Sequence, residues 1–252
     1  MHAHRFPKTF FHRELQPNLH LTLVVGVACL WSSALSAQSR PRPSADAAEA
    51  IAFELAFLDA PGTPRERESV RLRVLATGEV HCFDGRELVP CERLTVEELQ
   101  NLQRELLVDK NLGALSTDAL QSAGFATEIE GAATTIIRFH SNGAPHEVRC
   151  GALSVMAARF PDFPEVQRLF GAQLRLQNIA AVAEAGGSAA AEQLAAIANE
   201  TLAASRPDLP PLSPADLSMY RALSTGNRYV QFYRRPSDAR EELLVSLFES
   251  PG

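Results

Sequence analysis

Apolar and polar residues alternate in the first folded part of the chain. In residues 70–76, valine and leucine at every second position are separated by arginine and leucine. A period of two is expected when one face of a strand is buried and the other is in water. Residues 51–58 and 79–83 have the same β-like composition, and segments rich in turn-forming residues separate the three runs. The pattern therefore predicts three strands.

Helical spacing replaces this alternation in residues 95–108, where leucines recur every three or four positions. Thr95 is followed three residues later by Glu98. A threonine and a glutamate at this spacing form a capping box, which satisfies the free backbone N–H groups at the start of a helix. The pattern predicts a helix with one apolar stripe that packs on the sheet.

A β-hairpin is predicted in residues 134–150, around the pair Asn142 and Gly143. A two-residue type I′ turn needs positive φ at both positions, which glycine accepts freely and asparagine better than most residues. We therefore expect Asn142 and Gly143 to form the turn between two strands.

The last third of the chain begins with helical sequence. Two helices, 164–185 and 188–205, are predicted on either side of Gly186 and Gly187, which end the first of them. A proline-rich segment follows. Beyond it, the pattern predicts a short helix at 215–222 and two strands at 229–234 and 243–248.

These elements predict an α+β fold. We expect an antiparallel sheet of four or five strands backed by one helix, with an appended helical hairpin and a small C-terminal β-hairpin. The predicted organisation is a signal peptide at 1–37, a linker at 38–50, an α+β domain at 51–160, a helical hairpin at 161–206, and a C-terminal helix plus β-hairpin at 207–252.

The first 37 residues resemble a cleavable signal peptide. A basic start precedes an apolar run at 21–31, and its length of about 11 residues is well short of the roughly 20 that span a bilayer. Small residues follow up to Ala37. Export to the periplasm or exterior is therefore predicted, with no stable transmembrane segment after processing. Lipid anchoring at Cys29 is the alternative, although Gly26 occupies the place where a lipobox has a large aliphatic residue.

Charge argues against a nucleic-acid partner. Removing residues 1–37 leaves 21 basic and 29 acidic side chains, a formal charge of −8. Proteins that bind phosphate backbones need clustered lysine and arginine.

Gly-rich phosphate loops and the G-x-S-x-G nucleophile motif are also absent from the sequence. The sequence therefore predicts no cofactor and no catalytic residue.

Three cysteines remain after the predicted cleavage. Cys82 and Cys91 enclose a short segment with a turn signal at Asp84 and Gly85, so we predict a disulfide between them and expect Cys150 to be free and buried. The alternative is three buried thiols without a bond.

Histidines and cysteines offer one combination for a metal. Neighbouring strands could bring His81, His140 and Cys150 together. However, His140 and His146 are separated by five residues across a turn, which is not a zinc-binding pattern. No metal-binding residue is predicted.

The order of elements resembles known exported domains. Residues 51 to about 180 contain strands, then LTVEELQNLQREL, then TTIIRFHSNGAPHEVRC, then a closing helix. This layout is similar to small exported bacterial domains of unknown function and, more distantly, to the emfourin-type inhibitors of thermolysin-like metalloproteases. The resemblance implies an α+β fold and protease inhibition, and it assigns no functional residue.

Three functions follow from the sequence, in order of preference. The first is an exported, non-enzymatic binding or interaction protein, whose partner we expect to be another protein of the cell envelope or exterior. The second is a protease-inhibitor-like protein, and the third is an enzyme with an unrecognised site.

Overall fold

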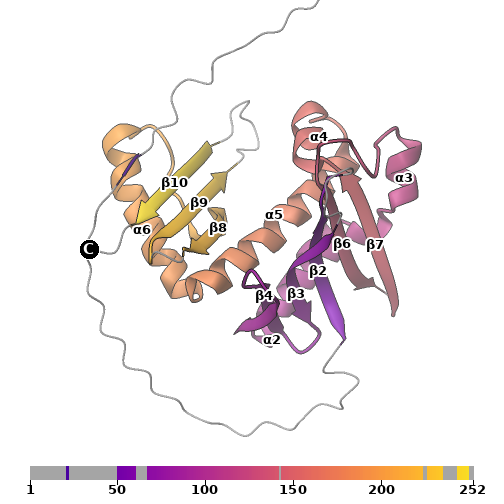
Figure 1. Ribbon diagram of the computed structural model, residues 1–252, viewed down its shortest axis with the longest axis horizontal. Coiled ribbons are helices and arrows are strands. Elements are labelled where there is room, and N and C mark those ends of the chain that lie inside the picture. The colour runs from indigo at the N-terminus through magenta and orange to yellow at the C-terminus, as the bar shows by residue number, and fades with distance from the viewer. Residues whose placement is uncertain are drawn as a thin grey trace, which may run out of the picture.

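The computed structural model describes residues 21–22, 50–60, 67–141, 143–223, 226–234 and 243–249. Within them the chain forms two antiparallel sheets linked by one long helix (Figure 1). The α+β class predicted from the sequence is therefore confirmed. Apart from residues 21–22 and residue 50, the predicted signal peptide and linker, including Cys29, lie outside the described residues, and so does the turn residue Asn142.

The larger sheet has six strands in the order β5-β4-β3-β2-β6-β7, all antiparallel to their neighbours, rather than the four or five expected. The three early strands and the hairpin formed by β6 and β7 occur where they were predicted. β5 is the strand that was not foreseen. The strands are β2 (Ile51–Leu58), β3 (Glu68–Leu75), β4 (Glu79–Phe83), β5 (Leu88–Arg93), β6 (Thr134–Ser141) and β7 (Ala144–Gly151).

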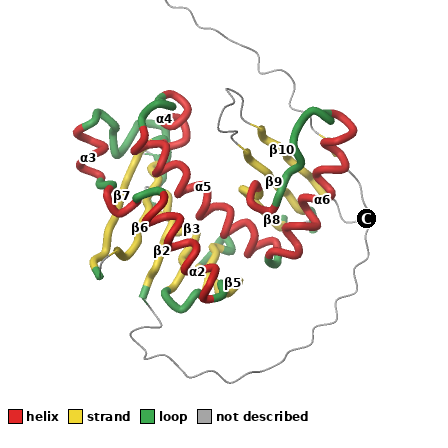
Figure 2. The backbone as a smooth tube through the Cα atoms, turned by 180° about the vertical axis from the view of Figure 1, so that it is seen from behind, coloured by secondary structure: helices red, strands yellow, loops and turns green. Residues whose placement is uncertain are grey.

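One face of this sheet is covered by helices and forms the main core. Figure 2 shows α2 (Val96–Gln103) and α5 (Pro164–Ala185) lying over the same face. The capping box at Thr95 and Glu98 is present, as predicted. Leu102 and the following π-helical turn, η1 (Arg104–Asp109), contribute to the core alongside α5, which is the main covering helix. Shorter elements close this unit: η2 (Leu112–Ala114), α3 (Thr117–Ser122) and α4 (Leu153–Arg159).

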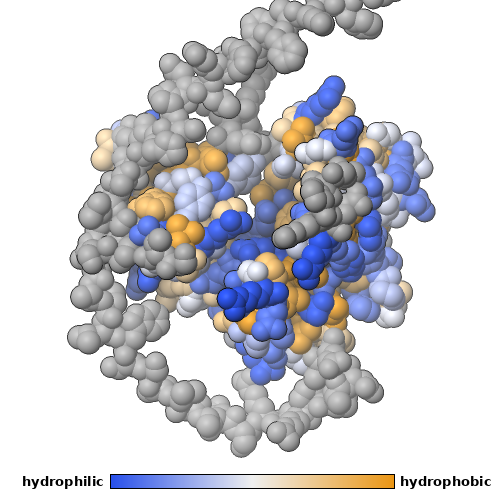
Figure 3. Space-filling model, in the orientation of Figure 1, coloured by the Kyte–Doolittle hydropathy of each residue, from blue (hydrophilic) through white to orange (hydrophobic). Residues whose placement is uncertain are grey.

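The opposite face of the large sheet is charged. Glu54 lies between Arg73 and Arg138 on the neighbouring strands, and its side chain is only 3% exposed. Arg73 Nε and Arg138 Nη1 donate to its two carboxylate oxygens at 2.8 and 2.7 Å. Arg138 also pairs with Glu68 and Glu147. Figure 3 shows hydrophilic residues over much of this side of the molecule. The buried carboxylate is tolerated because both of its oxygens are paired.

The smaller sheet contains three antiparallel strands and one short parallel strand, rather than the expected helix and hairpin. Residues predicted as a helix at 215–222 instead form a 3₁₀ turn, η3 (Pro214–Asp216), and strand β8 (Leu217–Ala222), which pairs with β9. The other strands are β9 (Arg228–Arg234), β10 (Leu243–Glu249) and the two-residue β1 (Leu21–Thr22), which lies parallel to β10.

Helix α5 joins the two sheets, and α6 (Ser188–Ser205) packs on the smaller one. The bounds of both helices agree with the prediction. Most of α5 is buried in the main core, whereas Ala181 near its end belongs to the second core. Gly186 ends α5 with a φ of 101°, a left-handed conformation that favours glycine. Among the described residues, no helix is both long and apolar enough to cross a membrane.

The predicted disulfide is absent, because Cys82 and Cys91 are both free thiols. Cys82 lies opposite Val89, and Cys91 is the extra residue of a β-bulge in β5. The interaction with the neighbouring Cys91 thiol, together with burial, raises the pKa of Cys82. Cys91 Sγ also lies 3.3 Å from the Val80 carbonyl oxygen. Cys150 is free and buried, as predicted, and burial raises its pKa to about 11.

Candidate functional site

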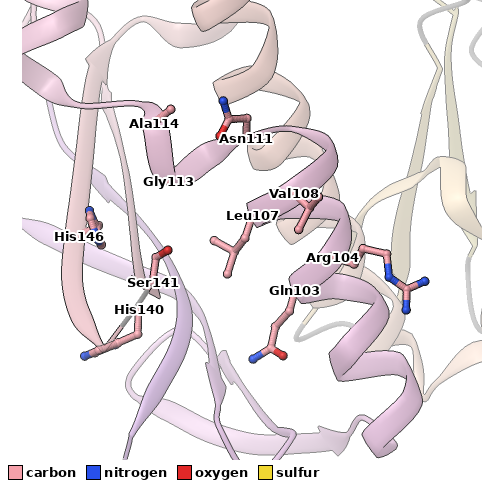
Figure 4. A pocket seen from close by; sticks show the side chains of 10 residues that line it. All are labelled: Gln103, Arg104, Leu107, Val108, Asn111, Gly113, Ala114, His140, Ser141 and His146. Carbon is pink, nitrogen blue, oxygen red and sulfur yellow. The ribbon is translucent and has the colours of Figure 1, made fainter.

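An open hollow of about 680 Å³ lies between the end of the α2–η1 helix and the tip of the β6–β7 hairpin (Figure 4). We call it the η1 hollow. Side chains from two helical turns and two strands surround it. Its lining residues are Gln103, Arg104, Leu107, Val108, Asn111, Gly113, Ala114, His140, Ser141 and His146.

The helical side of the hollow is shaped by the π-helical turn. Within η1 the Lys110 N–H reaches back five residues to the Glu105 carbonyl, at 2.9 Å. The wider turn leaves Leu106 buried while Leu107 is half-buried and Val108 is 69% exposed. Single π-turns of this kind are frequent at functional sites.

A left-handed residue then turns the chain back toward the sheet. Asn111 has a φ of 46°, and asparagine is one of the few residues other than glycine that adopt this conformation at low cost. The turn brings η2 against the hairpin, where a Cβ added to Gly113 would lie 3.3 Å from Ser141 Oγ. Glycine at this position therefore keeps the approach between the helical and strand sides close.

The strand side carries two imidazoles and a hydroxyl group. His140 Nδ1 lies 2.7 Å from the Ile51 carbonyl oxygen. A carbonyl only accepts, so Nδ1 carries the proton and Nε2 is left for another partner. The His146 ring stacks on Phe139, with centroids 5.2 Å apart and an interplanar angle of 6°. Both contacts fix the orientation of the imidazoles.

Several polar groups of the hollow bind nothing else in the described part of the chain. No hydrogen bond is formed there by the side chains of Gln103, Asn111 or Ser141, and no ion pair by Arg104. Figure 4 shows Gln103 and Leu107 directed toward the strand side, whereas the Arg104 guanidinium is turned away from it. The hollow therefore presents polar groups with unused hydrogen-bonding capacity beside an exposed apolar surface.

The candidate metal ligands are not brought together. His81 is on β4, opposite Arg73, and its Nε2 lies 2.9 Å from Glu79 Oε1. His140 is on β6, and two strands separate β4 from β6. Among the described residues, no group of three histidine, cysteine or acidic side chains is placed to hold a metal ion.

A second cavity, of about 520 Å³, lies between the two sheets near the end of α5. It is lined by Arg71 and Glu184, whose side chains form an ion pair at 2.7 Å, and by Tyr220 and Arg221 from the smaller sheet. Burial raises the pKa of Glu184 against the opposing effect of Arg71. Because this carboxylate is already paired with Arg71, we consider the η1 hollow the better candidate site.

Sequence reasoning placed His140 and His146 beside the hairpin tip but missed the helical half of the hollow. One sequence feature could have predicted this half, namely the segment Asn111-Leu-Gly113 directly after a predicted helix. Asparagine and glycine favour the left-handed conformation that turns the chain. The residues Gln103, Arg104 and Ser141 carried no motif, and only the fold assembles them with the histidines.

Comparisons with known proteins give no further assignment. No model of a protein family matches the chain. Searches of curated proteins and of solved structures likewise found no match.

Proposed function

We propose that this protein is an exported, non-enzymatic binding protein and that the η1 hollow is its ligand-binding site. The observation that carries the proposal is the set of unused polar groups around an open space. Gln103 and Ser141 are half-buried, whereas Arg104 and Asn111 are exposed, and the hydrogen-bonding capacity of all four side chains is available to a ligand. The volume of about 680 Å³ lies within the usual range for small-ligand sites.

Binding is a better account of this site than nucleophilic catalysis. In the described part of the chain, the Ser141 hydroxyl forms no hydrogen bond with His140 or His146, and an activated serine needs a base within hydrogen-bond reach. His140 uses Nδ1 to hold its own orientation against the Ile51 carbonyl. A rigid, hydrogen-bonding wall of this kind is suited to orienting a bound molecule.

A matched pair of substitutions tests the hollow. Ala114 lines it and Ala119 on α3 does not, although both side chains are exposed. We expect Ala114→Phe to fill the hollow and Ala119→Phe to leave it open. Small-molecule fragments should shift the backbone amide NMR signals of hollow residues in the wild type and in Ala119→Phe, but not in Ala114→Phe. Fragment binding that is confined to other surfaces, or that survives Ala114→Phe, would contradict the proposal.

Export has a separate test. The proposal places the mature N-terminus between Leu35 and Ser39, because small residues follow the apolar run there. N-terminal sequencing of protein isolated from its native host should find this start. A start at Cys29 would establish lipid anchoring instead, and a start at Met1 would exclude cleavage of a leader.

A further inference from the structure

We infer that the ligand of the η1 hollow is a small organic anion, in which one carboxylate is joined to an apolar group. This inference rests on the proposed function. The chain as a whole is acidic, with 30 acidic and 24 basic side chains. None of the ten residues that line the hollow is acidic, and one of them is Arg104. The lining residues themselves therefore carry a positive rather than a negative formal charge, which favours an anion over a cation.

The polar groups of the hollow match a single carboxylate. Gln103 and Ser141 each supply a hydrogen-bond donor. Arg104 is exposed and has no ion-pair partner in the described part of the chain. Its guanidinium is turned away from the strand side in Figure 4, so it contacts a bound ligand only after a change of rotamer. A guanidinium binds a carboxylate through two parallel hydrogen bonds.

The apolar groups of the hollow match the rest of such a molecule. Leu107, Val108 and Ala114 lie on its helical side, and Val108 is among the most exposed large apolar residues described. An apolar ligand group placed there would remove this surface from water. We therefore expect the ligand to have an apolar group in addition to its carboxylate.

The helical geometry argues against a phosphate site. Phosphate sites commonly use the N-terminus of a helix, where free N–H groups and the helix dipole favour anions. The hollow instead lies at the C-terminal end of η1, beside Val108 and Asn111, where the dipole has the opposite sign. The C-terminal end of η1 therefore lacks the free N–H groups of a phosphate site, and the attraction for an anion has to come from the Arg104 side chain.

Three probes of similar shape test the inference: 4-phenylbutyrate, the neutral 4-phenylbutyramide and the cationic 4-phenylbutylamine. Their dissociation constants are measured with the full mature chain by NMR titration of hollow amides. We expect the carboxylate to bind about tenfold more tightly than the amide, the factor associated with one charge-assisted hydrogen bond. The amine should bind most weakly, and added salt should reduce the preference for the carboxylate.

Two arginine variants identify the group responsible. Arg104→Gln should reduce carboxylate binding to the level of the amide. Arg86→Gln, which removes an exposed arginine from the β4–β5 turn, should leave both affinities unchanged. If acid and amide bind equally and Arg104→Gln has no effect, while Ala114→Phe still abolishes binding, the hollow is a binding site but the anion inference is wrong. If no probe of any charge perturbs the hollow, the inference and the proposed function both fail.

Discussion

At the scale of single residues, two glycines show how the same backbone conformation has different consequences in different surroundings. Gly78 and Gly143 have positive φ values of 84° and 77°. A Cβ at Gly78 would lie 2.6 Å from the Leu94 carbonyl oxygen, whereas one at Gly143 would meet nothing within 4 Å. Gly143 is therefore required for its conformation alone, and Gly78 for its conformation and its lack of a side chain.

The two alanine variants should differ accordingly. Gly143→Ala should lower the free energy of unfolding by about 1 kcal/mol, the cost of a left-handed conformation for an L-residue. Gly78→Ala adds a clash with backbone and should cost more than about 3 kcal/mol. Urea denaturation of both variants measures the difference. Equal losses would show that the Gly78–Leu94 contact relaxes without cost.

At the scale of elements, the ion-pair network connects four strands of the large sheet through one arginine. Arg138 on β6 bonds Glu54 on β2, Glu68 on β3 and Glu147 on β7. The hydrogen bond from Arg138 lowers the pKa of Glu68, and that from Arg149 is the main cause of the lowered pKa of Glu147. The charged groups on this face of the sheet are thus paired with one another, which explains how the Glu54 carboxylate is buried without being left unpaired.

This network predicts a pH dependence of stability. The pKa of Glu68 is lower in the folded protein than its ordinary value of 4.5, so its stabilising contribution is present above about pH 4.5 and is lost as the pH falls through the folded value. Urea denaturation from pH 7 to pH 3 should therefore show wild type more stable than Glu68→Gln at neutral pH, with a difference that shrinks in acid. Glu97→Gln, an exposed helix acid, is the control. A difference that grows toward pH 3 would contradict this role of Glu68.

At the scale of the whole molecule, α5 is shared by two cores of unequal size. The larger core extends over the six-stranded sheet, and the smaller one lies between α6 and the C-terminal strands. Fewer buried apolar side chains mean less stabilisation from burial. We therefore expect the smaller core to open without the larger one.

Phe232→Ala tests this independence. Phe232 is fully buried in the smaller core. Replacing such a residue by alanine lowers the free energy of unfolding of the surrounding core by about 3 to 5 kcal/mol. Hydrogen exchange measured by NMR should show faster exchange of amides in β8, β9 and β10, while amides of β2 and β6 keep their protection. Equal acceleration in both sheets would show that α5 couples them into one cooperative unit.

Local patterns predicted those elements whose stabilising contacts lie within a few residues. The capping box at Thr95, the glycine at the hairpin tip and the glycine that ends α5 all act between near neighbours, and all three are present in the structure. The same holds for the bounds of α5 and α6. The predicted disulfide is absent, and the β-bulge that takes Cys91 out of direct register with Cys82 leaves no mark in the spacing of cysteines.

The tertiary structure decided the features whose partners are distant in sequence. Residues 217–222 become a strand because β9 supplies hydrogen-bonding partners that a short, weakly specified helix cannot match. Glu54 is buried because arginines from two other strands meet it there. The η1 hollow joins a helix end at residues 103–114 to strand residues 140–146. The sequence by itself determined local conformation and hydrophobic pattern, whereas long-range pairing determined which polar groups lie together, because that depends on the register and packing of elements far apart in the chain.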